Sequence, residues 1–224
     1  MSPPSARPLL LPSSDEQLAA DLLLPEQAQG LVVFVHGSGS SRRSPRNQQV
    51  AGYFYARGLA TLLFDLLTEP EQRQDMRTGE LRFNIPLLTR RLLGVLDSLT
   101  GKPEVADLPI GLFGASTGAA AALLAAAERP ELVQAVVSRG GRTDLARSAL
   151  PRVQAATLQI VGGRDWLVLE INQATSRQLH CEQSLAVVPS ATHLFEEPGT
   201  LEEVARLAAD WFVAHLGQQP QHGT

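Results

Sequence analysis

The chain has few of the residues on which several classes of protein depend. Its 224 residues include a single cysteine, Cys181, which excludes an intrachain disulfide and is too little for a zinc site built on cysteines. No apolar run approaches the roughly 18 residues that a membrane-spanning helix requires. The net charge of −4 gives no electrostatic reason to expect binding to nucleic acid or to an anionic membrane surface. An enzyme or a binding protein for small molecules is the expected class.

The beginning of the chain also lacks a feature. Residues 1–12 contain no charged segment followed by a long apolar stretch, so we expect no secretory signal and a cytoplasmic location. With 44% hydrophobic residues the chain can bury a sizeable core, and its length suits one domain. The expectation is a single domain over residues 1–224, with flexible tails at residues 1–8 and 217–224.

Short apolar runs alternate along the chain with segments of helical periodicity. Strands are predicted at residues 7–11, 17–24, 31–35, 59–64, 109–113, 133–137, 157–161 and 184–188. Helices are predicted at residues 45–57, 84–99, 119–129, 143–150, 167–179 and 200–216. The first two strands should form a hairpin, and the polar segment 69–82 is expected to be an exposed loop. The alternation predicts an α/β fold with a mostly parallel central sheet and helices on both faces.

One stretch at a strand-to-helix junction has the pattern of a nucleophile elbow. Gly114-Ala115-Ser116-Thr117-Gly118 lies between the strand at 109–113 and an alanine-rich helix. In such a turn the serine sits on a strained backbone, and the two glycines allow the flanking backbones to approach closely. Its hydroxyl would project beyond the carboxyl end of the sheet, where open α/β sheets bind ligands. The competing interpretation is that Ser116 caps the helix that follows it.

A serine hydroxyl needs a base to take its proton, and the base needs an acid to orient it. The candidate base is His193, in the loop after the last predicted strand. The candidate acid is Asp165, which follows the preceding strand after a Gly-Gly turn. Each has a structural alternative, because His193 would also fit as a loop residue without a task and Asp165 as a helix cap. A rival acid is Asp144, which comes after the strand at 133–137.

Together these motifs resemble the α/β-hydrolases and, within them, the small dienelactone hydrolase-like proteins. The resemblance covers about residues 30–215 and rests on His36-Gly37-Ser38-Gly39, Gly114-Ala115-Ser116-Thr117-Gly118, Gly162-Gly163-Arg164-Asp165 and His193. It implies an α/β-hydrolase fold with Ser116, Asp165 and His193 as a catalytic triad in the chain order of that fold. Dienelactone hydrolases carry a cysteine at the elbow, so the resemblance does not extend to a dienelactone substrate.

The same pattern predicts how the reaction's negative charge would be held. An oxyanion hole of this type uses the backbone N–H groups of Thr117, after the nucleophile, and Ser38, in the loop after the strand at 31–35. His36 is expected to brace that loop rather than to act as a second base. Because residues 137–157 leave too little chain for a cap domain, the site is expected to be open.

Other side chains near the carboxyl ends of the predicted strands are candidates for substrate contacts. Arg139 is a candidate for holding an anionic part of the substrate, and this prediction rests only on its place after the strand at 133–137. Trp166 and Phe195 are candidates for pocket walls, although packing in the core would explain them equally well. Three arginines lie in the loop after the strand at 31–35 and at the start of the helix at 45–57. They are expected to form a solvated face and are Arg42, Arg43 and Arg46.

The function predicted from these residues is that of a serine hydrolase. It would cleave a small ester of the carboxylesterase, lactone or thioester type through an acyl-enzyme on Ser116, with no metal or organic cofactor. The expected partner is a small-molecule ester, with no nucleic acid or membrane, and the sequence is compatible with a homodimer. Two alternatives remain open: a non-catalytic binding protein that keeps the fold, and an acyltransferase that uses the same three residues.

Overall fold

The structure is a computed structural model that describes residues 6–14 and 16–217. Its centre is an eight-stranded sheet in the order β1-β2-β4-β3-β5-β6-β7-β8. β1 and β2 form an antiparallel hairpin, β2 is antiparallel to β4, and every other neighbouring pair is parallel. The strands are β1 (Arg7–Ser13), β2 (Glu16–Leu23), β3 (Leu31–Val35), β4 (Ala60–Phe64), β5 (Ile110–Ala115), β6 (Val133–Arg139), β7 (Ala156–Gly162) and β8 (Gln183–Val188).

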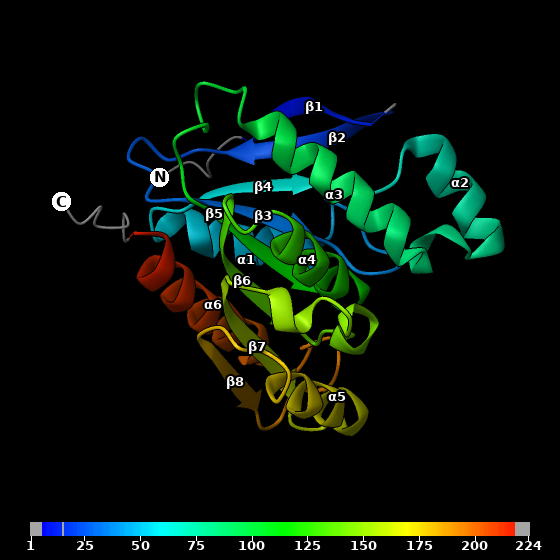
Figure 1. The fold of residues 1–224 in the computed structure, drawn as a ribbon, viewed down its shortest axis with the longest axis vertical. Coiled ribbons are helices and arrows are strands. Elements are labelled where there is room, and N and C mark those ends of the chain that lie inside the picture. Colours follow the sequence, from blue (N-terminus) through cyan, green and yellow to red (C-terminus); the bar gives the residue numbers. More distant parts are fainter. Residues whose placement is uncertain (1–5, 15, 218–224) are drawn as a thin grey trace.

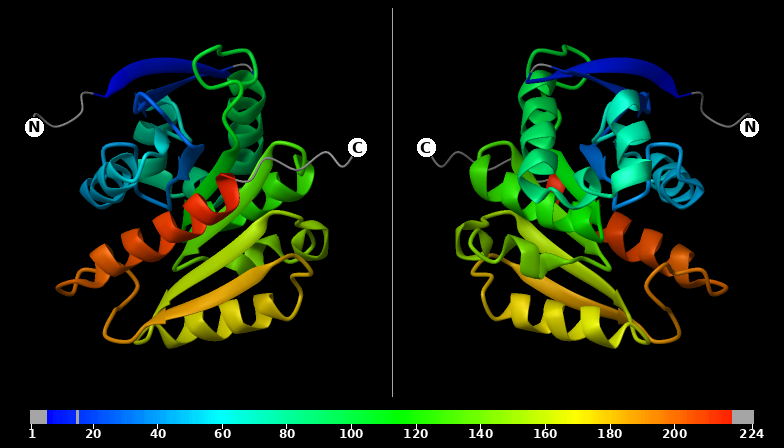
Figure 2. Two further views of the ribbon diagram at one scale, coloured as in Figure 1. Left: turned by 90° about the vertical axis from the view of Figure 1, so that its left-hand side faces the viewer. Right: turned by 90° about the vertical axis from the view of Figure 1, so that its right-hand side faces the viewer.

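Helices cover both faces of this sheet (Figure 1). One face carries α1 (Pro45–Ala56) and α6 (Thr200–Leu216), which pack against each other. The opposite face carries α3 (Ile85–Leu99), α4 (Thr117–Glu128) and α5 (Trp166–Ser176). The side views show that the hairpin β1–β2 and strand β8 lie at opposite ends of the molecule (Figure 2). The predicted α/β architecture with a mostly parallel sheet is therefore confirmed.

Each face of the sheet has its own hydrophobic core. Between the sheet and the α1–α6 pair, the rings of Phe34, Phe54, Phe113 and Phe212 lie with centroids 5.0–5.6 Å apart. Such tilted and edge-on aromatic contacts contribute beyond the area that they bury. On the other face, the small alanines of α4 let this helix lie close to the strands. The central strands β3, β4 and β5 are buried along their whole length, as parallel strands covered on both sides should be.

Local signals in the sequence explain where the main helices begin. The Ser44 side chain accepts a hydrogen bond from the Asn47 N–H, and Pro45 occupies the first turn of α1. The Asn84 side chain caps α3 in the same way, accepting from the Leu87 N–H. Within residues 6–14 and 16–217, none of the helices combines the length and the apolar character that crossing a membrane requires.

The prediction of an exposed loop over residues 69–82 is wrong. The segment contains α2 (Glu69–Thr78) and a short 3₁₀ helix, η1 (Leu81–Phe83). A capping box starts α2, because Thr68 and Glu71 each accept a hydrogen bond from the other's backbone N–H. Gly79 ends the helix in the left-handed conformation. Only one residue of α2 is buried, so the apolar periodicity that reveals most helices is missing here.

Two smaller expectations also need correction. The predicted helix at 143–150 is two short 3₁₀ helices, η2 (Thr143–Ala146) and η3 (Leu150–Arg152). The expected N-terminal tail over residues 1–8 overlaps β1, which begins at Arg7 and pairs with β2. Residues 1–5, residue 15 and residues 218–224, where the rest of the expected tails falls, lie outside the described residues.

Candidate active site

Ser116 occupies the tight turn between β5 and α4. Its backbone angles are φ 51° and ψ −120°, in a region that residues with a side chain seldom adopt. It stands at the N-cap position of α4, but its side chain makes no capping hydrogen bond. The competing role of helix cap is therefore not supported, and the hydroxyl remains free for other contacts.

The glycines around Ser116 are required by close contacts between backbones. A Cβ atom on Gly114 would lie 2.6 Å from the Cα of Ala119 in α4. A Cβ on Gly118 would lie 2.1 Å from the carbonyl oxygen of Val35, at the end of β3. The second contact is with β3 rather than with the elbow's own strand, so the elbow glycines bring together three elements.

His193 and Asp165 form a pair at the same end of the sheet. The Nδ1 atom of His193 lies 2.6 Å from Oδ2 of Asp165, and an ionised carboxylate can only accept this hydrogen bond. Asp165 stands at the N-cap position of α5 without capping it, because its carboxylate is turned to the imidazole. The His193 side chain is 39% exposed, so its other nitrogen can be reached. This is the geometry by which an acid fixes the tautomer of a base.

Asp144, the rival acid, is engaged elsewhere. Both of its carboxylate oxygens accept hydrogen bonds from the guanidinium of Arg142, at 2.9 and 2.8 Å. These bonds lower the pKa of Asp144. Its side chain is also largely exposed, and no hydrogen bond joins it to His193 among the described residues. The structure thus brings His193 together with Asp165 and not with Asp144.

The backbone of β6 links Ser116 to the His193 loop. The Ser116 N–H donates to the carbonyl of Arg139 at 3.1 Å, which fixes the elbow against the end of β6. The next residue, Gly140, packs beside the imidazole, and a Cβ atom there would lie 3.4 Å from two atoms of the His193 ring. Ser116 and His193 therefore flank the same short stretch of chain.

The loop after β3 approaches the elbow from the other side. A Cβ on Gly37 would lie 3.1 Å from the Cβ of Ser116, so this loop passes directly beside the serine. Ser38 follows in an exposed position, while Thr117 is buried at the first position of α4. The two N–H groups expected to form an oxyanion hole thus belong to segments that meet at Ser116.

His36 braces this loop, as the sequence predicts. Its Nδ1 atom is 2.9 Å from the Gly37 carbonyl, and its Nε2 atom accepts a hydrogen bond from the Leu66 N–H at 3.0 Å. A donor at Nδ1 and an acceptor at Nε2 define a neutral imidazole. Burial lowers the pKa of His36, against the opposing effects of the Gly37 carbonyl and Asp65. His36 thus connects the loops that follow β3 and β4 through hydrogen bonds.

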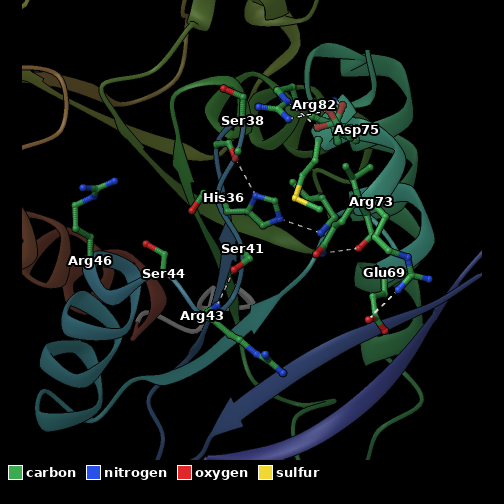
Figure 3. A pocket seen from close by; sticks show the side chains of 18 of the residues that line it. His36, Ser38, Ser41, Arg43, Ser44, Arg46, Glu69, Arg73, Asp75 and Arg82 are labelled. Carbon is green, nitrogen blue, oxygen red and sulfur yellow. Dashed lines mark hydrogen bonds and ion pairs between the residues drawn. The ribbon is translucent and has the colours of Figure 1, made fainter. Parts of the chain in front are cut away.

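A cavity of about 680 Å³ opens beside the same loop (Figure 3). Ser44 and Arg46, from the beginning of α1, lie on one side of it, and Glu69, Arg73 and Arg82 lie on the side of α2 and η1. Most of the residues that line it are polar or charged, while Met76 and several leucines add apolar surface. Its inner edge is formed by residues 36–41, which include the candidate oxyanion donor. Ser116, Asp165 and His193 do not line this cavity, which comes near the elbow through Gly37, the residue packed beside Ser116.

Of the three arginines expected on a solvated face, Arg42 is mostly buried and Arg46 is only partly exposed. The guanidinium of Arg42 forms ion pairs with Asp65 and Asp21 and is mostly buried. Arg46 forms an ion pair with Glu196 at 2.9 Å, and its Nε atom is buried without a partner. Arg43 is exposed, as predicted. Sequence reasoning missed the Arg46–Glu196 contact because no local pattern signals a pairing between residues 150 positions apart.

Arg139 ends β6 with its side chain turned toward the α1–α6 face. Its guanidinium lies over the Phe113 ring, 5.7 Å from the centroid, and the described residues provide no carboxylate partner for it. Its Nη1 atom is buried without a hydrogen-bond partner. Burial, together with the neighbouring Arg46 cation, lowers the pKa of Arg139 to about 10. Arg139 is therefore still a cation at neutral pH.

The energetics of this arginine are unfavourable in the absence of an anion. A cation on an aromatic face contributes about 0.5–2 kcal/mol. Removing an ion from water costs several kcal/mol, and this cost is normally offset by a counter-ion. Arg139 is partly exposed, so water offsets part of this cost, but the Phe113 contact does not replace the acceptor that the buried Nη1 atom lacks.

The two aromatic candidates for pocket walls differ. Phe195 is 1% exposed and belongs to the core between the sheet and the α1–α6 pair, so it is a core residue. Trp166 is 76% exposed at the first turn of α5, next to Asp165. Trp166 is thus available to a ligand but does not line the cavity beside the β3–α1 loop.

The chain is similar to proteins of known structure. No model of a known protein family matches the chain. The crystal structure of a dienelactone hydrolase from Anabaena variabilis is 53% identical in sequence, has a TM-score of 0.94, and covers 96% of this chain and 99% of that one. Est1E from Butyrivibrio proteoclasticus is 17% identical with a TM-score of 0.77, covering 94% of this chain and 99% of its own. At that identity the second likeness shows the fold alone.

The chain is also similar to curated proteins that are longer. Two proteins of Mycobacterium tuberculosis, both provisionally named phosphoribosyl transferases, are 56% identical to it over 199 residues. The match covers 89% of this chain but 44% of theirs. The chain therefore spans less than half the length of the curated relatives that it matches.

Proposed function

The chain belongs to the dienelactone hydrolase-like α/β-hydrolases, and from that premise we propose that it is a serine hydrolase that cleaves small esters. The observation that carries the proposal is the hydrogen bond of 2.6 Å between His193 and Asp165, at the end of the sheet where the elbow presents Ser116. Neither polar group of the pair has another role in the fold, since Asp165 does not cap α5. A base oriented by an acid is what a serine nucleophile needs.

The reaction has two halves. In the first, the Ser116 oxygen attacks the ester carbonyl while Nε2 of His193 takes its proton; the ester C–O bond then breaks, and the alcohol leaves with that proton. In the second, a water molecule gives a proton to His193 and attacks the acyl-enzyme, which releases the acid and restores the serine. Asp165 holds the imidazole in the required tautomer and stabilises its charged form.

The negative charge that develops on the carbonyl oxygen would be held by the backbone N–H groups of Ser38 and Thr117. Donors fixed before the reaction need no reorganisation, and losing one such donor costs about 10²–10³ in turnover. The support for this role is the position of Gly37 against Ser116 and the hydrogen bonds formed by His36. Trp166, exposed beside Asp165, is proposed as a contact for an apolar part of the substrate.

The name of the mycobacterial relatives suggests phosphoribosyl transfer, a different reaction. That name applies to proteins more than half of whose length has no counterpart in this chain. We therefore do not carry that name over to this chain, for which the proposal remains a hydrolase.

Labelling of the intact protein with a fluorophosphonate tests the proposal. Wild type should form a covalent adduct whose mass matches one modified serine, and Ser116→Ala should form none. The neighbouring Ser38→Ala, which keeps its backbone N–H, is the matched control and should still be labelled. Equal labelling of wild type and Ser116→Ala would disprove the nucleophile.

A panel of p-nitrophenyl esters, lactones and thioesters then separates the remaining candidates. Hydrolysis in water supports the ester hydrolase, and faster product formation when an alcohol or amine is added would instead favour an acyltransferase. A folded protein that is neither labelled nor active on any member of the panel would favour a binding protein with this fold.

A further inference from the structure

Arg139 stands out among the charged side chains near Ser116 because nothing in the described part of the chain neutralises it. Other partly or mostly buried guanidiniums at this end of the sheet have carboxylate partners, as Arg42 has Asp65 and Arg82 has Asp75, whereas Arg43 is exposed to solvent. Arg139 instead has a buried Nη1 atom without an acceptor, and the Arg46 cation, which lies near enough to act on it through space, helps to lower its pKa. An anion at Arg139 would meet the hydrogen-bonding potential of Nη1 and would also offset the repulsion that the two cations exert on each other.

The location of this pair ties it to the reacting atoms. The carbonyl of Arg139 accepts the N–H of Ser116, and in the sheet Arg139 is paired with Ala115, the residue before the nucleophile. The next residue, Gly140, touches the His193 ring. Arg46 lies in the first turn of α1 and reaches the 680 Å³ cavity (Figure 3). An anion bound by Arg139 would therefore lie at the same end of the sheet as Ser116.

Arg46 is already shared with an internal anion. Its guanidinium contacts Glu196, three residues after His193, at 2.9 Å, and both side chains are partly exposed. Exposed ion pairs of this kind are weak and can exchange partners. Glu196 thus competes with any external anion for Arg46, whereas Arg139 has no such competitor.

We propose that Arg139 and Arg46 form a subsite for a carboxylate or phosphate group of the substrate, so that the protein acts on anionic esters. This rests on the proposed hydrolase function and deepens it, because Arg139 becomes the residue that selects the substrate class. A planar guanidinium matches both kinds of oxyanion through paired N–H donors, so the two sources share one chemistry.

Free anions test the subsite without any dependence on catalysis. At constant ionic strength, succinate and inorganic phosphate should each raise the melting temperature of wild type, and the more effective of the two identifies the anion. Arg139→Met should lose this response. Arg147→Met, which removes an exposed arginine from the turn after η2, is the matched control and should keep it.

The buried charge itself gives a second readout. Without added anion, Arg139→Met should melt about 2–8 °C higher than wild type, because a partly desolvated cation without a counter-ion is replaced by an apolar chain of similar length. A functional site that is held at a cost in stability behaves in this way, and a structural arginine would show the reverse. A lower melting temperature for Arg139→Met together with an unchanged anion response would overturn the proposal.

Paired substrates show whether the anion belongs to the acyl or the alcohol part. For the acyl part, the mono-p-nitrophenyl ester of succinate is compared with p-nitrophenyl butyrate, and the ester of 3-phosphonopropionate provides the phosphate-like arm. For the alcohol part, 4-acetoxybenzoate is compared with 4-acetoxybenzamide. In wild type the anionic member of one pair should have a kcat/KM about 10- to 100-fold higher, and Arg139→Met should abolish that preference.

Glu196→Gln tests the competition for Arg46. Freeing Arg46 should tighten the binding of succinate or phosphate several-fold, whereas Glu202→Gln, an equal charge change in the first turn of α6, should have a smaller effect. No preference for the anionic ester in either pair, with active wild-type protein, would overturn the subsite and leave the hydrolase intact. Absence of all turnover and of the fluorophosphonate adduct would instead remove the hydrolase, while the melting experiments would still decide whether an anion binds.

Discussion

The carboxylate of Asp165 lies 2.6 Å from Nδ1 of His193, although Asp165 occupies a position from which aspartate usually caps a helix. The preceding turn explains the choice. The Gly163 N–H donates to the Val188 carbonyl and the Arg164 N–H donates to the Ala191 carbonyl, so the loops that carry the acid and the base are tied together by their backbones. The side-chain pair is thus fixed by two neighbouring loops rather than by one flexible contact.

Replacing Asp165 by asparagine should lower kcat strongly, whereas the same replacement of Asp144 should change kcat little. Asp165→Asn should lower kcat for a p-nitrophenyl ester by up to about 10⁴, because an amide would favour the wrong imidazole tautomer. Asp144→Asn removes the same charge but disturbs only the Arg142 ion pair, so its kcat should stay within a few-fold of wild type. Steady-state kinetics of the two variants decide the matter, and the opposite ranking would make Asp144 the acid.

The buried His36 should make the protein less stable in mild acid. In the unfolded chain its pKa is about 6.5, and burial lowers the pKa in the folded protein. Below about pH 6.5 the unfolded state therefore binds the proton more readily, and stability is lost as pH falls toward the lower folded pKa. His36→Gln should reduce this slope. Urea midpoints of both proteins between pH 7 and pH 5 measure it, and parallel curves would show that His36 does not contribute.

Replacing glycine by alanine should change the free energy of unfolding in opposite directions at Gly118 and at Gly52. Gly118→Ala would place a methyl group 2.1 Å from the Val35 carbonyl oxygen, so the end of β3 or the start of α4 must move. The expected loss is at least about 2 kcal/mol of unfolding free energy. Gly52→Ala lies within α1, where an added Cβ meets nothing within 4 Å, and should stabilise by about 0.5–1 kcal/mol. Urea denaturation compares them; similar effects of the two changes would contradict the close contact.

Loss of the capping box should loosen α2 without unfolding the rest of the chain. Thr68→Ala removes the hydroxyl that accepts the Glu71 N–H, at a cost of about 0.5–2 kcal/mol to that helix. Because α2 packs on little besides η1, hydrogen exchange should accelerate in its amides and hardly at all in α4. Thr78→Ala, at the other end of α2, is the control. Unchanged exchange in Thr68→Ala would mean that the cap contributes little.

The parts of the fold that sequence reasoning finds are those with strong local patterns. Buried strands such as β3 reveal themselves by continuous apolar runs, and α3 by its three- and four-residue spacing. α2 was missed because both its faces are polar, although Thr68 and Glu71 already provide the capping signal in the sequence. A search for capping boxes without apolar periodicity would have found it.

The candidate site shows the same division. Ser116, Asp165 and His193 each follow a predicted strand, and parallel strands place such residues at one edge. Which aspartate contacts the imidazole depends on loop geometry, and the sequence left Asp144 open. The isolation of Arg139 could not be predicted at all, because a missing partner is a property of the whole packed structure.

The position of the His193 imidazole depends on how Phe195 packs in the hydrophobic core. It has a positive φ of 54° and is 1% exposed, so two residues after His193 the chain is pinned into the aromatic core that holds Phe54 and Phe212. On heating, we expect the packing around Phe195 to loosen before the sheet unfolds. Ester hydrolysis should therefore be lost at a temperature some degrees below the melting temperature. Phe54→Leu, which leaves a cavity in this core, should increase the difference between these two temperatures.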